Sequence, residues 1–124
     1  MDPSLQEMEA LAQVALKRLP QELLVHVDGV VIQVEEFPDR QTVRELNLQS
    51  RYDLLGLYRG VPIDQKSVTA TPDDIDMIFM YRGPILDFWN ETGEDLSHLV
   101  RHVLIHEIGH HFGLSDADME RIES

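Results

Sequence analysis

Apolar residues recur every three or four positions over the first twenty residues, and this spacing predicts an amphipathic helix. The apolar positions of this stretch are Leu5, Met8, Leu11, Ala12, Ala15, Leu16 and Leu19. Asp2 is a candidate cap, and Ser4 with Glu7 offers an alternative capping box. Pro20 ends or resets the helix, because a proline cannot donate the backbone hydrogen bond that continues it.

Three short apolar runs, at residues 30–34, 54–58 and 75–81, predict strands. The polar stretch 39–53 is predicted to be loop with one helical turn at 42–46. Residues 64–74 are rich in turn formers, which indicates a surface loop or hairpin connection. A short helix is expected at 85–90.

The longest helical pattern covers residues 95–112, and Thr92 and Asp95 in front of it have capping-box spacing. Gly113 follows at the position where glycine adopts the left-handed conformation that ends a helix. The pattern therefore predicts an α+β fold with an N-terminal helix, a small mixed sheet of about three strands and a C-terminal helix. We expect one domain over residues 1–124.

Composition and charge narrow the classes of partner. With 23 acidic and 10 basic residues, the chain of 124 residues has a formal net charge of −13. Nucleic acid and anionic membranes are therefore not expected as partners, since both attract basic surfaces. The N-terminus has no signal-peptide pattern and no apolar run is long enough to span a membrane, which predicts a soluble cytoplasmic protein. The oligomeric state stays open.

The chemically informative segment is HEIGHHFGLSD, residues 106–116. On a helix, residues four apart lie about 40° apart around the axis and about 6 Å apart along it, so His106 and His110 are able to bind one metal ion. Because the chain has no cysteine, the remaining ligands of such an ion must come from His, Asp or Glu. Glu107 is displaced by about 100° from His106, within reach of a metal-bound water, which is the position of a general base.

A third ligand is expected beyond the helix. Gly113 permits a sharp reversal of the chain, after which Asp116 is able to turn its carboxylate back toward the ion. Two histidines and one aspartate leave a fourth position open for water, as in catalytic zinc sites. Glu120 and Glu123 are alternatives for the third ligand, and Asp116 is the preferred candidate.

The motif resembles the HExxHxxGxxH/D pattern of the metzincin-like zinc metallopeptidases, with Asp116 where most members have a histidine. The short chain and the strand-like lead-in DMIFMYRGPI are similar to the mini-zincins. The resemblance implies a zincin-like fold, a Zn²⁺ cofactor and a peptide or protein substrate. It also implies that a metal-activated water hydrolyses peptide bonds, with His106, His110 and Asp116 as ligands and Glu107 as general base. The chain is thus expected to be a zinc metalloendopeptidase.

Several alternatives remain at this stage. Only eight residues follow Asp116, so a catalytically silent metal-binding regulatory or interaction protein is the competing hypothesis. His98 and His102 continue the four-residue series backward, and we expect them to be polar-face histidines near Arg101 and not part of the metal site. His102 lies only about 40° from His106 around the helix, so it is also placed to line the cleft or to replace a ligand in a mutant. His111 is expected to be partly buried and hydrogen-bonded, either for packing or in support of the ligands. The strand at 75–81 is either a substrate-pairing edge strand, as the resemblance implies, or an ordinary core strand.

Overall fold

The computed structural model describes residues 2–60 and 75–124. Its helices are α1 (Leu5–Lys17), α2 (Gln21–Leu24), α3 (Arg40–Glu45), α4 (Arg82–Thr92), α5 (Leu96–His111) and α6 (Asp116–Glu123), with a short 3₁₀ turn, η1 (Arg51–Asp53). Its strands are β1 (Val31–Glu35), β2 (Gly56–Arg59) and β3 (Met77–Tyr81). The predicted α+β class with a three-stranded mixed sheet is confirmed. The predicted connection at 64–74 lies outside the described residues.

The strands form one sheet in the order β1-β3-β2. β1 pairs with β3 in parallel, with Ile32 opposite Ile78. β2 pairs with β3 antiparallel, with Gly56 opposite Met80. β3 is therefore the central strand, so the interpretation of residues 75–81 as an edge strand is wrong. Its apolar run is typical of a strand whose two faces are both covered, and Ile78 and Met80 on one face are completely buried.

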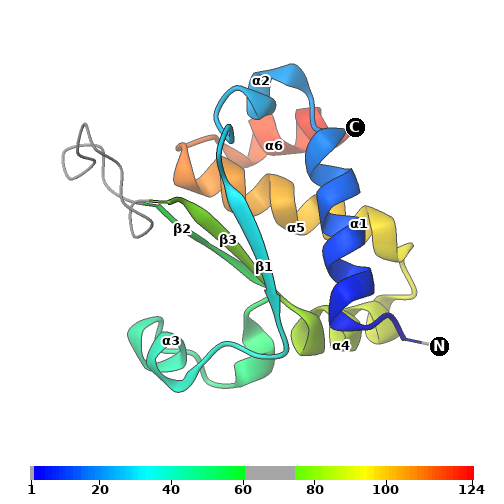
Figure 1. Cartoon of the computed structure of the whole chain (residues 1–124), viewed down its shortest axis with the longest axis vertical. Coiled ribbons are helices and arrows are strands. Elements are labelled where there is room, and N and C mark those ends of the chain that lie inside the picture. Colours follow the sequence, from blue (N-terminus) through cyan, green and yellow to red (C-terminus); the bar gives the residue numbers. More distant parts are fainter. Residues whose placement is uncertain (1, 61–74) are drawn as a thin grey trace.

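Two helices, α1 and α5, cover the sheet and form the centre of the core with it. α1 packs against β1 and α5, and α5 also packs against β2 (Figure 1). The side chains of Met8, Ile78, Met80, Leu104 and Ile108 are all completely buried between these elements. Because α5 is held from both sides, its polar face is fixed relative to β2. Among the helices that the structure describes, none combines the length and apolar character needed to cross a membrane.

The helices differ from the prediction in three places. Ser4 caps α1 through a capping box with Glu7, whereas Asp95 alone caps α5 by accepting a hydrogen bond from the His98 backbone N–H. The predicted pairing of Thr92 with Asp95 is wrong because the Thr92 hydroxyl instead donates to the Phe88 carbonyl. α4 begins at Arg82, directly after β3, and not at residue 85.

The third difference has the greatest consequence. The segment after Gly113, for which the sequence pattern predicted no element, forms α6 (Figure 1). Its N-cap is Ser115, which exchanges hydrogen bonds with Asp118 in a capping box. Met119 and Ile122 are buried against the rest of the protein. α6 therefore extends the core at the end of the molecule where the predicted metal ligands lie.

Candidate metal centre and active site

The reversal that follows α5 has the geometry of a Schellman motif. Gly113 has a φ of +76°, in the region that favours glycine. The Leu114 N–H donates to the Gly109 carbonyl at 2.8 Å, and the Gly113 N–H donates to the His110 carbonyl at 3.3 Å. The chain therefore turns sharply after the motif, as predicted, and α6 starts at once at Asp116.

α6 is anchored to α5 beside Gly109. Met119 is fully buried, and its side chain occupies the space next to Gly109. Further along α6, the Arg101 guanidinium donates to the carbonyls of Ile122 and Glu123 at 3.4 Å each. The start of α6 is thus joined to the end of α5, while its last residues lie beside the middle of α5.

Three histidines on successive turns of α5 line one side of this helix pair. The ring centroids of His102 and His106 are 4.1 Å apart, and those of His106 and His110 are 5.7 Å apart. His106 is the central member and is partly buried, with 30% of its side chain exposed. Burial lowers the pKa of His106, the neighbouring His102 lowers it further, and Glu123 opposes both effects. A lower pKa keeps the imidazole neutral near pH 7, and the neutral form is the one that binds metals.

Glu123, the last residue of α6, reaches these histidines. Its Oε1 atom lies 3.3 Å from His106 Nε2 and 2.8 Å from His102 Nδ1. His102, His106 and Glu123 form a group whose candidate ligand atoms all lie within 4.8 Å of one another. Glu120 and Glu123 were the secondary candidates in the sequence, and only Glu123 lies in this group, whereas Glu120 is exposed on α6 outside it. The capping box at Ser115 and Asp118 is the signal that would have predicted the helix that carries Glu123.

The other two predicted ligands lie outside this group. His110 is exposed on the last turn of α5, and Asp116 is exposed on the first turn of α6. Both are close enough to influence His106 electrostatically, since His110 lowers its pKa and Asp116 raises it. Both side chains are exposed, and the ring of His110 meets the ring of His106 edge-on.

Glu107 lies on the face of α5 that packs against β2. Burial raises the pKa of its carboxyl group, while His110 and a hydrogen bond from the Tyr58 backbone N–H oppose the shift. A Cβ on Gly56 would lie 3.4 Å from Glu107 Cγ and 2.8 Å from a methyl group of Val103. The missing side chain at Gly56 therefore lets β2 approach α5 closely. The carboxylate is held in a largely desolvated position beside His106.

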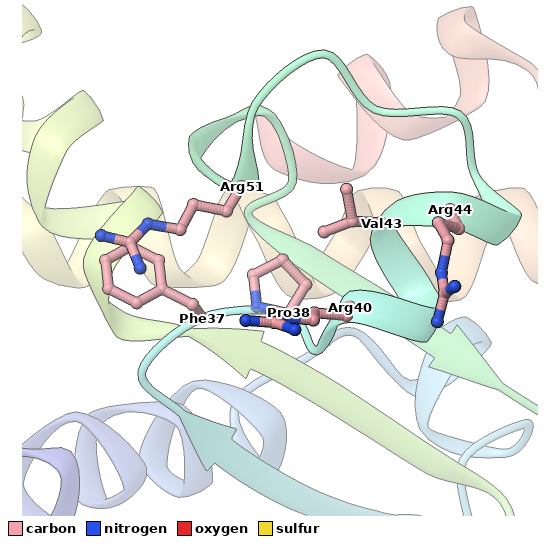
Figure 2. Close-up of a pocket in the computed structure, with 6 residues that line it drawn as sticks. All are labelled: Phe37, Pro38, Arg40, Val43, Arg44 and Arg51. Carbon is pink, nitrogen blue, oxygen red and sulfur yellow. The ribbon is translucent and has the colours of Figure 1, made fainter.

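A cavity of about 240 Å³ lies beside His106 and Glu107, between α5 and the segment that leads into β2. Its other lining residues are Asp53, Leu54, Leu55, Gly56, His102 and Val103. A separate hollow of about 500 Å³ lies around α3 and η1, where Arg40, Arg44 and Arg51 surround an apolar floor of Phe37, Pro38 and Val43 (Figure 2). Its lining contains none of the predicted site residues, so the smaller cavity is the candidate substrate site.

His111 does not have the predicted environment. It is exposed, not partly buried, and its ring stacks on Tyr58 of β2 with centroids 3.9 Å apart and ring planes 14° apart. Its ring also meets the ring of Phe112 edge-on, with centroids 4.9 Å apart. His111 therefore fastens the end of α5 to the edge strand.

The sequence matches the family model of the zincin-like metallopeptidases over residues 27–124. The chain belongs to this family. The match begins just before β1 and includes the whole sheet, α5 and α6. None of the curated proteins matches the chain. Membership of the zincin-like family implies a bound metal, typically zinc, and a peptide or protein as substrate.

Proposed function

We propose that this chain is a zinc metalloendopeptidase in which Glu107 is the general base and His106, His110 and Asp116 hold the ion. The single observation that carries the proposal is the position of Glu107. Within a zincin-like chain, its carboxylate is desolvated next to His106 and lines the cavity beside it. A carboxylate with a raised pKa is suited to accept and return a proton near neutral pH.

The residues around His106 fit a zinc ion. Imidazole nitrogens and carboxylate oxygens are its usual ligands in a chain without thiols. Glu123 Oε1 is shielded from solvent, accepts no hydrogen bond of good geometry from the described residues and lies next to the ring nitrogens of His102 and His106, so a cation bound by these rings would compensate its charge. A bound zinc ion would supply Lewis-acid polarisation of the scissile carbonyl and would acidify a water molecule.

The chain's own residues would then handle the substrate and the proton. Glu107 accepts a proton from the attacking water, whose oxygen bonds to the carbonyl carbon, and donates that proton to the amine as the carbon–nitrogen bond breaks. An extended peptide would lie along β2, the edge strand beside α5, in the β-augmentation mode. The cavity at His106 and Glu107 would accept one substrate side chain.

The second candidate function is a catalytically silent metal-binding protein. Glu123 favours it, because a carboxylate this close to His106 would complete a set of four protein ligands with His110 and Asp116. Structural zinc sites are closed in this way, whereas catalytic sites keep a position for water.

Cleavage of a diverse peptide library by the zinc-loaded protein, followed by mass spectrometry, separates the two functions. We expect cleavage products with the native chain and none with Glu107→Ala, while both proteins bind zinc equally. Glu120→Ala, an exposed glutamate on α6, is the matched control and should retain cleavage. Equal turnover by the Glu107 variant would show that the base is misassigned, and the absence of products from the native chain would favour the silent protein.

A further inference from the structure

α5 and α6 together present two sets of candidate ligands, and both include His106. α6 begins near His110 and ends near His102, so it places one carboxylate at each end of the histidine series. Asp116 is on the first turn of α6, just after the reversal that follows His110, and Glu123 contacts the pair His102 and His106. Each pair has the four-residue spacing that lets two imidazoles share one ion.

The distances within the second set are close to those that a divalent ion requires. Ligand atoms about 2.0 to 2.2 Å from a tetrahedral zinc are separated by roughly 3.3 to 3.6 Å. The distance of 3.3 Å from His106 Nε2 to Glu123 Oε1 fits this range, whereas the 2.8 Å from His102 Nδ1 to the same oxygen is shorter. An opening of about 0.5 Å would bring this second distance into range.

The burial of Glu123 also points to a cation. Only 17% of its side chain is exposed, compared with 43% for His102. Oε2 lies 3.0 Å from His102 Nδ1, within hydrogen-bond distance. Oε1 accepts no hydrogen bond of good geometry from the described residues, and it lies 2.8 Å and 3.3 Å from the ring nitrogens of His102 and His106, which are themselves candidate metal ligands. A shielded carboxylate oxygen without a donor is costly unless a positive charge compensates it.

We propose that His102, His106 and Glu123 form a second binding site for the divalent ion, alternative to the site at His106, His110 and Asp116. The inference rests on the proposed zinc site, because the two sites compete for His106. His106 Nε2 has one lone pair, so it binds a single ion and only one site is filled at a time. When an ion occupies the second site, His106 is not available to bind an ion together with His110 and Asp116 beside Glu107. The protein is then inactive.

The decisive experiment measures Zn²⁺ affinity and stoichiometry by competition with a chromophoric chelator. We expect the native chain to bind one ion. His110→Ala/Asp116→Asn should still bind one ion, with affinity lowered at least about tenfold. Adding Glu123→Gln to this double variant should reduce the remaining affinity by at least another factor of about ten. Adding Glu120→Gln instead, which removes an exposed carboxylate from the same helix, should leave it unchanged.

Two results would overturn the inference: no zinc binding by the double variant, or binding that is insensitive to Glu123→Gln. Circular dichroism checks that each variant is folded. If the double variant does not fold, the test uses the native chain loaded with Co²⁺ instead. The absorption spectrum of the bound Co²⁺ reports which ligands surround the ion. That spectrum should change with Glu123→Gln and stay the same with Glu120→Gln, and an unchanged spectrum for both overturns the inference. Failure of the proposed function is distinct, because the native chain itself would then bind no zinc or cleave no peptide.

Discussion

Met119 occupies the space beside Gly109 in which another residue at this position of α5 would place its Cβ atom. Gly109 directly precedes His110, and Met119 is completely buried. The contact therefore fixes the distance between α5 and α6, and with it the positions of Asp116 and Glu123 relative to the histidines.

Gly109→Ala should destabilise the protein. The new methyl group would overlap the Met119 side chain, and overpacking of a core contact costs about 1–3 kcal/mol. Replacing a mid-helix glycine by alanine returns about 1 kcal/mol through helix propensity. We therefore expect a net loss of up to about 2 kcal/mol in the free energy of unfolding, measured by urea denaturation.

A double-mutant cycle provides the control for this prediction. Met119→Ala alone should cost about 2–5 kcal/mol because it opens a cavity. In that background the space beside Gly109 is empty, so adding Gly109→Ala should stabilise the protein by up to about 1 kcal/mol. If Gly109→Ala has the same sign in both backgrounds, the contact with Met119 does not explain the glycine.

The sequence predicts the part of the site that depends on local pattern. The helical spacing of the histidines and the glycine that ends α5 are local signals, and both the helix and its reversal are confirmed. The sheet order is not local. The run of apolar residues in β3 is typical of a central strand, yet the resemblance to zincins made an edge position an equal alternative.

α6 was missed for a related physical reason. It is eight residues long, and a helix this short is not stable by itself in water. Only Met119 and Ile122 on it are buried, which is too few apolar positions for a periodic signal. The packing of Met119 beside Gly109 stabilises α6, so the approach of Glu123 to His106 follows from tertiary contacts that the sequence pattern does not contain.

Tyr58 should tolerate loss of its hydroxyl group better than loss of its ring. The hydroxyl donates to Asp76 at 3.0 Å, and the ring stacks on His111. Tyr58→Phe removes one hydrogen bond and should lower the free energy of unfolding by about 1 kcal/mol. Tyr58→Ala also removes the stacked ring and should cost about 3 kcal/mol. Equal losses in chemical denaturation would mean that the stack with His111 contributes nothing.

Asp39 should make the stability of the protein vary with pH in the acid range. As the N-cap of α3, it accepts a hydrogen bond of 2.7 Å from the Thr42 backbone N–H, which lowers the pKa of its carboxyl group below the usual 3.8. An acid with a lowered folded-state pKa stabilises the protein above its unfolded pKa, and this contribution is lost as pH falls through the folded pKa. The Tm difference between the native chain and Asp39→Ala should therefore be largest near neutral pH and shrink below pH 3.8.

Asp39→Asn is the matched control for this pH dependence. Asparagine caps helices as well as aspartate does but has no charge to lose. The Tm difference between Asp39→Asn and Asp39→Ala should stay constant across the same pH range. A parallel decline for both comparisons would assign the acid sensitivity to another group.

Zinc should raise the Tm of the native chain, because an ion that binds only the folded state stabilises it by mass action. At a free concentration of 100 times Kd the gain is about 2.7 kcal/mol, which corresponds to roughly 10 °C for a domain of this size. His106→Ala should abolish the shift, since both proposed ligand sets include this residue, whereas His98→Ala on the same helix should leave it intact. Differential scanning fluorimetry with zinc, and again after chelation, measures the effect. A full shift in the His106 variant would place the ion elsewhere in the protein.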